Sequence, residues 1–144
     1  MHYRTSVRSR ADPLALALNL HAVTLLVPDY DAGIAFYVGQ VGFALRADIA
    51  MGGGKRWVLV APAGGQTGLL LARASDAAQV AAIGHQTGGR VGFFLHSDDF
   101  AADHARMRAA GVTFDEEPRL EPYGTVAVWR DPWGNRWDLL QLRS

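Results

Sequence analysis

Asp138 is a single carboxylate within an apolar, extended run at residues 136–142. A buried carboxylate costs free energy unless a partner compensates for its charge. Asp138 must therefore face water, or it must lie opposite hydrogen-bond donors, a positive charge or a metal ion. An ion pair with Arg130 or Arg136 and a place in a functional site are both open at this point.

Six further side chains are of types that could line a pocket for a small molecule. Aromatic rings on strands can stack on a ligand or simply fill the core, and an arginine can bind an anionic group or stay exposed. A histidine at the end of a strand can instead help to cap the helix that follows. The residues that we predict to line a substrate pocket are Arg56, Trp57, His96, Tyr123, Trp129 and Trp137.

Local catalytic motifs are absent from the sequence. It contains neither the Gly-x-Ser-x-Gly elbow of serine hydrolases nor the His-Glu-x-x-His motif of zinc proteases. The glycines at 52–54 are followed by Lys55 and Arg56, whereas a phosphate-binding loop ends in Gly-Lys-Ser/Thr. A site in this protein must therefore combine residues that are far apart in the sequence.

The composition excludes several classes of function. The 14 basic side chains equal the 14 acidic ones, whereas binding through nucleic-acid phosphates needs a basic surface. No apolar run approaches the roughly 18 residues of a membrane span, so we predict neither a nucleic-acid partner nor a membrane partner. The sequence has no cysteine, which excludes disulfides and fits the reducing cytoplasm. We therefore predict a cytoplasmic location.

Hydrophobic patterning and turn residues predict two similar series of elements. In the first half we expect a helix capped by Asp29 at 30–38, with strands at 20–27, 43–49, 56–61 and 68–72. In the second half we expect a helix at 100–110, with strands at 90–96, 112–116, 125–130 and 136–142. The predicted organisation is one compact domain with a flexible N-terminal extension at 1–19, a first module at 20–72, a connector with a short helix at 73–89, and a second module at 90–144.

Residue spacing indicates that these two series are an internal repeat. Asp29 precedes Gly42 by 13 positions, and Asp98 precedes Gly111 by the same number. Each predicted helix thus lies between an acidic cap and a terminating glycine. We predict an α+β fold of two βαβββ modules, in which a curled mixed β-sheet forms a trough with the helices outside.

The two modules, the opening HAVTLLVPDYDAGIAFYVGQVGF and the closing DPWGNRWDLLQL resemble the vicinal oxygen chelate superfamily. This superfamily includes glyoxalases, extradiol dioxygenases and bleomycin-resistance proteins. The resemblance covers residues 20–142, and the second half is similar to a glyoxalase-like branch. It implies a trough that binds a small molecule, and a homodimer in which two chains complete each trough.

The resemblance also implies a divalent metal ion, Ni, Zn, Fe or Mn, held by the first and last strands of each module. His21 and Asp138 match two of the four usual ligand positions, and Leu70 and Gly92 stand at the other two. A catalytic metal commonly has three protein ligands and an open position. With only two, metal-free binding is an equal alternative.

Two functions follow from this resemblance. In the first, a weakly ligated metal at His21 and Asp138 polarises a small oxygenated substrate, as in a metal-dependent lyase or dioxygenase. In the second, the trough binds and sequesters a small molecule without a metal, as bleomycin-resistance proteins do. An apolar pocket with a few placed polar groups suits the second function.

Overall fold

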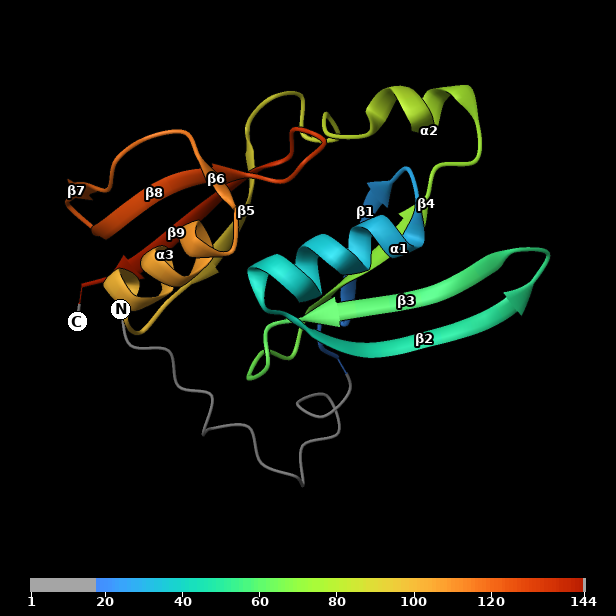
Figure 1. Ribbon diagram of the computed structural model, residues 1–144, viewed down its shortest axis with the longest axis horizontal. Helices are drawn as coiled ribbons and strands as arrows, with labels where there is room; N and C mark the ends of the chain where they lie inside the picture. The colour runs from blue at the N-terminus through green and yellow to red at the C-terminus, as the bar shows by residue number, and fades with distance from the viewer. Residues whose placement is uncertain (1–17, 144) are drawn as a thin grey trace.

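The computed structural model describes residues 18–143, so the predicted extension lies outside the described residues except for its last two positions. The chain forms two sheets with helices, and the predicted α+β fold of two βαβββ modules is confirmed (Figure 1). No helix among the described residues is long and apolar enough to cross a membrane. The elements of the first module are β1 (Ala22–Val27), α1 (Tyr30–Ile34), the π-helix η2 (Ala35–Val41), β2 (Ala44–Gly52), β3 (Lys55–Ala61) and β4 (Gly68–Arg73).

The second module repeats this order after the connector helix α2 (Ala77–Ala82). Its elements are β5 (Val91–His96), α3 (Phe100–Ala109), β6 (Thr113–Phe114), β7 (Arg119–Glu121), β8 (Gly124–Arg130) and β9 (Arg136–Leu142). Sheet A has the order β1-β4-β3-β2, and sheet B has the order β5-β9-β8-β6, with β7 also paired to β8. In each sheet the first strand of the module runs parallel to its last strand.

Strand β7 was not predicted from the sequence. It pairs antiparallel with β8 over three residues and lies between Pro118 and Pro122. Proline cannot donate to a sheet ladder and is therefore confined to edges and strand ends. The two prolines are compatible with a short edge strand, but in the sequence they indicate a loop, so the strand was not predicted.

The first helical segment is longer than predicted, because it continues from α1 through η2 to Val41. Asp29 caps it by accepting a hydrogen bond from Ala32 N at 2.9 Å, and Gly42 ends it with a φ of 96°. In the second module the cap is Asp99, which lies 12 positions before Gly111, so the first module holds one more residue. A π-helix places more residues in each turn than an α-helix. The π-helix therefore accommodates the extra residue.

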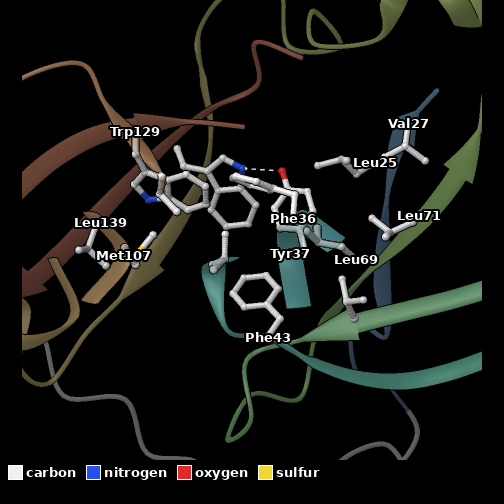
Figure 2. Packing of buried hydrophobic residues seen from close by; sticks show 14 of the residues in the cluster. Leu25, Val27, Phe36, Tyr37, Phe43, Leu69, Leu71, Met107, Trp129 and Leu139 are labelled. Atoms are coloured by element: carbon white, nitrogen blue, oxygen red, sulfur yellow. Dashed lines mark hydrogen bonds between the residues drawn. The ribbon is translucent and has the colours of Figure 1, made fainter. Parts of the chain in front are cut away.

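One core joins the two modules. Figure 2 shows the rings of Phe36, Tyr37 and Phe43 from the first module between Trp129 of sheet B and the aliphatic side chains of sheet A. Trp129 and Trp137 stack with ring centroids 4.8 Å apart. In Figure 1 the cyan helix α1 lies in the middle of the molecule, with sheet B on the left and sheet A on the right. The core therefore lies between the two sheets.

Each sheet has one face toward this core and one face away from it. Side chains alternate along a strand, so core residues such as Leu71 and Trp137 alternate with residues that point the other way. The open face of sheet A comprises Thr24, Ile49, Trp57, Leu59 and Leu70, which neighbour one another in the register. The open face of sheet B comprises the exposed Phe94 and the buried side chains of Val126, Val128, Asp138 and Leu140.

Candidate ligand-binding site

Asp138 lies on the open face of sheet B. Its strand β9 is central, and the register places it between Phe94 of β5 and Val128 of β8. The residue is only 7% exposed, and its Oδ1 has no hydrogen-bond partner. Burial raises the pKa of this carboxyl above its usual value, and the negative charge of Glu116 raises it further. The positive charges of Arg119 and Arg136 act in the opposite direction.

A charged cluster from the β6–β7 connection lies close enough to Asp138 to affect its ionisation. Arg119 Nε donates to both carboxylate oxygens of Glu116 at 3.2 and 3.1 Å, and its Nη1 donates to Glu121. Glu116 Oε2 also accepts from the backbone N of Val128 at 3.0 Å. The guanidinium of Arg119 is thus shared by two other carboxylates, and it leaves Asp138 without a direct counter-ion.

Arg136 and Arg130 were the sequence candidates for a partner of Asp138, and both bind elsewhere. Arg136 Nη1 donates to the carbonyl of Gly89 at 3.2 Å. Arg130 Nε donates to Asp115 at 2.8 Å. The ordinary ion pair considered for Asp138 is therefore not formed by either arginine.

His21 is not positioned to join Asp138 in a metal site. It directly precedes β1, and its side chain is exposed. The alternation of β1 puts position 21 on the same side as Leu25, which faces the core, whereas Asp138 is on the open face of the other sheet. The predicted ligand pair is thus separated by module and by face within this chain.

The donor set in the described chain does not fit a resident metal ion. Catalytic sites commonly use three protein ligands. Among residues 18–143, no three His, Cys, Asp or Glu side chains cluster as metal ligands. Leu70 and Gly92, at the other two family positions, offer no side-chain donor. We therefore derive no chemical step through a metal.

Trp129 and Trp137 are both buried in the core, and Trp137 also lines a cavity of about 380 Å³ together with Phe93 and Phe94. Trp129 is fully buried, and Trp137 packs between it and Phe93. Trp137 Nε1 donates to the hydroxyl of Tyr37 at 3.1 Å. Both rings alternate with Asp138 or Val128 and so face the helices. Sequence alone could not separate the two faces because both are apolar.

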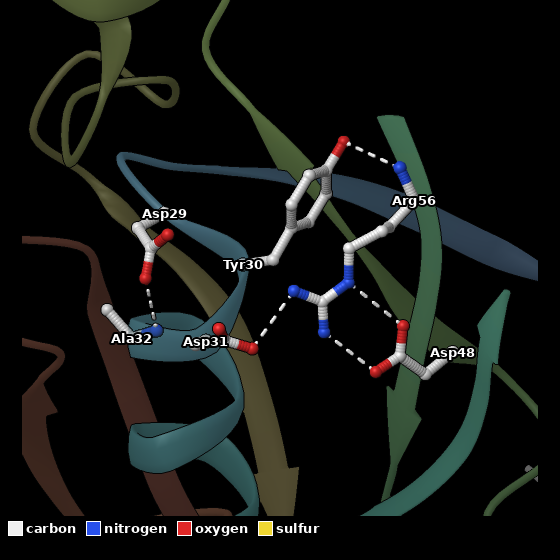
Figure 3. Close-up of polar contacts among 6 residues, drawn as sticks. All are labelled: Asp29, Tyr30, Asp31, Ala32, Asp48 and Arg56. Atoms are coloured by element: carbon white, nitrogen blue, oxygen red, sulfur yellow. Dashed lines mark hydrogen bonds and ion pairs between the residues drawn. The ribbon is translucent and has the colours of Figure 1, made fainter. Parts of the chain in front are cut away.

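Arg56 lies on the helix side of sheet A, where it holds β3 to β2 and α1 (Figure 3). Its guanidinium contacts Asp48 at 2.7 Å and Asp31 at 2.9 Å, and it stacks over the ring of Tyr30 at 5.2 Å. The hydrogen bond from Arg56 holds the pKa of Asp48 below its usual value. An arginine with two carboxylate partners has little free capacity for an anionic ligand.

Trp57 differs from its neighbour Arg56, because its ring is on the open face of sheet A. Directly across the register lies Ile49, and both side chains are exposed. A cavity of about 410 Å³ opens at this end of the sheet. Trp57, Met51, Leu70 and also Arg56 are among the residues that line it.

The two remaining candidates, His96 and Tyr123, lie at the same end of sheet B, on either side of the C-terminal end of β9. His96 ends β5, where its Nε2 accepts from Leu142 N at 3.3 Å and its Nδ1 lies 3.8 Å from Asp98. It thus has local partners at the strand end. Tyr123 stands in the turn before β8 and is half exposed. Its backbone carbonyl accepts a hydrogen bond from Arg143 N.

Sequence reasoning missed the charged cluster and the exposed apolar side chains of Phe94 and Ile49 on the open faces. The signal for the cluster was the run at 115–121, where acidic residues and an arginine crowd between two predicted strands. Phe94 and Ile49 gave no such signal, because each is one apolar residue among many. Only the register shows that they point away from the core.

Comparison with known proteins assigns the chain to a protein superfamily. Residues 19–139 match the profile of the Glyoxalase/Bleomycin resistance protein/Dioxygenase superfamily. The chain belongs to this superfamily. A Shewanella frigidimarina protein, named only as uncharacterized, is 49% identical over 124 residues, which cover 85% of this chain and 92% of the relative.

Solved structures of the superfamily include close matches to the fold. UcmS2 superposes with a TM-score of 0.75 and 32% sequence identity, over 87% of this chain and 98% of its own. TnmS3 from Streptomyces sp. CB03234, described as an antibiotic binding protein, has a TM-score of 0.72 and 33% identity over 89% and 98% of the two chains. At least one structural relative is therefore described as a binding protein for a small molecule.

Proposed function

We propose that this protein binds and sequesters a small, largely aromatic molecule, without a metal ion, on the open faces of its sheets. The observation that carries the proposal is the exposure of large apolar side chains there. Ile49 is 57% exposed and lies across the register from the exposed Trp57, and Phe94 is 64% exposed on a strand whose other face, with Phe93 and Leu95, packs against the core. Contiguous exposed apolar surface of this kind is typical of ligand or protein interaction sites.

A homodimer would turn these faces into enclosed sites. Both core faces belong to one core, so the two open faces of a single chain point away from each other. The open face of sheet A therefore cannot cover the open face of sheet B within one chain, but it can cover that of a second chain. We propose that each trough consists of the open face of sheet A from one protomer and that of sheet B from the other.

The structural relatives support binding over catalysis. TnmS3, at 33% identity, is described as an antibiotic binding protein. A ligand of that kind needs stacking surfaces and a few polar contacts, which Trp57, Phe94 and Asp138 offer. The metal ion, the lyase or dioxygenase chemistry and the cytoplasmic location stay predictions.

The test is a fluorescence titration with acridone, a flat neutral aromatic molecule. We expect saturable binding to the wild type, and affinity about tenfold lower in Trp57→Ala and in Phe94→Ala, because stacking on an aromatic side chain contributes roughly 1–3 kcal/mol. Val80→Ala is the matched control, since Val80 is equally exposed but lies on α2. Absence of binding, or equal affinity in all three variants, would contradict the proposed site.

A further inference from the structure

We propose that the carboxylate of Asp138 binds a protonated amine carried by the aromatic ligand. This inference rests on the proposed function and names the chemical class of its ligand. The established features of the fold do not require it, because a neutral ligand could fill the same apolar trough. It is carried by three observations on the open face of sheet B.

The first observation is the unused hydrogen-bonding capacity of Asp138. More than nine-tenths of the residue is buried, and Oδ1 has no partner among the described residues. A buried polar group without a partner costs roughly 1–3 kcal/mol in mutational data. Oδ1 has less than 1 Å² of exposed surface, so a ligand would meet the carboxylate at the 7% of the residue that is exposed, where a positive charge would offset part of this penalty.

The second observation is the balance of charge around Asp138. Three carboxylates, of Glu116, Glu121 and Asp138, face two guanidinium groups, of Arg119 and Arg136. Glu116 and Glu121 share Arg119, and Arg136 donates to a backbone carbonyl. These five groups together carry a net charge of −1, and Asp138 is the carboxylate among them that has no direct counter-ion. A cation compensates for that charge, whereas a neutral donor does not.

The third observation is the nature of the surrounding wall. The ring of Phe94 lies directly across the register from Asp138 and is 64% exposed. Aromatic faces attract cations that are held within about 6 Å of the ring. An amine next to an aromatic ring system can therefore meet Asp138 while the ring system stacks on Phe94.

A metal ion fits this position less well than an amine. A metal needs several donors arranged around it, and residues 18–143 contain no such group of three ligands. An ammonium group needs only one strong acceptor and a polarisable surrounding. Asp138 provides the acceptor, and the ring of Phe94 provides the polarisable surrounding.

The experiment compares three probes that share one ring system and differ in charge: 9-aminoacridine, which is a cation at pH 7, neutral acridone and anionic acridine-9-carboxylate. Fluorescence titrations of the full chain give the affinity of each probe. We expect 9-aminoacridine to bind at least about tenfold more tightly than acridone, as for a hydrogen bond to a charged group. Acridine-9-carboxylate should bind most weakly.

Two variants locate the preference. Asp138→Asn removes the charge and keeps the shape, so it should abolish the preference for 9-aminoacridine over acridone. Glu121→Gln removes a nearby charge that is already paired with Arg119, and it should retain most of the preference. The circular dichroism spectrum of each variant checks that it is folded.

The outcomes separate this inference from the proposed function. If acridone binds and the cation has no advantage, or if Asp138→Asn keeps the advantage, the amine site is wrong and the binding function stands. Equal loss of preference in Glu121→Gln would show a diffuse electrostatic effect and would also overturn the specific contact. If none of the three probes binds, both proposals fall.

Discussion

Leu70 and Asp138 occupy the same place in the two halves of the molecule, although one is apolar and the other is a carboxylate. Leu70 lies on β4 between Thr24 and Leu59, and Asp138 lies on β9 between Phe94 and Val128. The fold thus accepts a leucine where its repeat carries a buried charge. Asp138 is not needed to form a central strand, which leaves ligand binding as its proposed role.

The turns before the last strands of the two modules also differ, because the second module again has a carboxylate where the first has an apolar residue. In the second module the Asp131 carboxylate accepts hydrogen bonds from the backbone N of Trp133, Gly134 and Asn135, and from the hydroxyl of Tyr37 at 2.7 Å. The first module has Ala61 at the corresponding turn. Here the carboxylate has a full set of partners, so its role is structural. The contrast with Asp138 shows that hydrogen-bond partners, more than burial, distinguish a structural carboxylate from a candidate ligand group.

Asp131→Ala should have the largest effect on stability. It removes the acceptor for the turn and for Tyr37, and leaves several buried donors unpaired at roughly 1–3 kcal/mol each. We expect the free energy of unfolding to fall by at least about 3 kcal/mol, measured by urea unfolding at one fixed protein concentration. Tyr37→Phe removes only one of these bonds and should cost less. A loss below that of Tyr37→Phe would show that the turn does not depend on the carboxylate.

Leu70→Asp makes the first module resemble the second, and it should be the next largest effect. Leu70 lies between Thr24 and Leu59 in the register of sheet A, so a carboxylate there replaces an apolar side chain beside Leu59. We expect a loss of about 2 kcal/mol at pH 7, with partial recovery when the new carboxyl is protonated at low pH. Leu70→Asn, which does not titrate, is the control. Equal losses in the two variants at every pH would exclude a charge effect.

Asp138→Leu makes the second module resemble the first. Replacing an unpaired buried carboxylate by the apolar side chain that the first module carries should raise the free energy of unfolding by about 1 kcal/mol. The same variant should lose its preference for 9-aminoacridine. Asp138→Asn, which remains polar, should gain less stability. A clear loss of stability in Asp138→Leu would mean that Asp138 supports the fold and would weaken its assignment to the ligand.

The repeat could be predicted from the sequence because helix caps, terminating glycines and alternating apolar residues are local signals. Asp29 and Gly42 bound the first helical segment as expected, and the alternating apolar runs gave the eight main strands. Local signals failed where two answers differ by one residue. Asp98 and Asp99 are both possible caps in the sequence, and the structure shows that Asp99 accepts the hydrogen bond from Ala102 N. The π-helix gave no signal in the sequence. The short β7 depends on its partner β8.

The site was predicted less well, because its residues are defined by which face they occupy. Asp138 was recognisable as a carboxylate in an apolar run, and its lack of an ion pair became visible only with the register. Trp129 and Trp57 look alike in the sequence, yet one is fully buried and the other is exposed on the open face. A slip of one position along a strand exchanges its two faces, and this is also why His21 matched a ligand position in sequence but not in space.

His104 and Ile34 occupy corresponding positions in the two modules, since each lies five positions after its helix cap. A substitution at His104 should have the smallest effect of those considered. His104 packs between Phe100 and Phe114, and its Nε2 is buried without a partner. Burial lowers the pKa of His104 below its usual value, the positive charge of Arg108 lowers it further, and Glu117 partly opposes this.

The unfolded chain therefore binds the His104 proton more readily than the folded chain, and stability should fall as the pH drops below about 6.5, the unperturbed pKa of histidine. His104→Ile, which copies the first module, should lose less stability than the wild type between pH 7 and pH 5. The measurement is the difference between the two proteins in urea unfolding at each pH, which cancels the titration of carboxylates common to both. A constant difference across this range would show that the ring is free to protonate in the folded state, and the second module would then tolerate a charge on its helix as well as on its sheet.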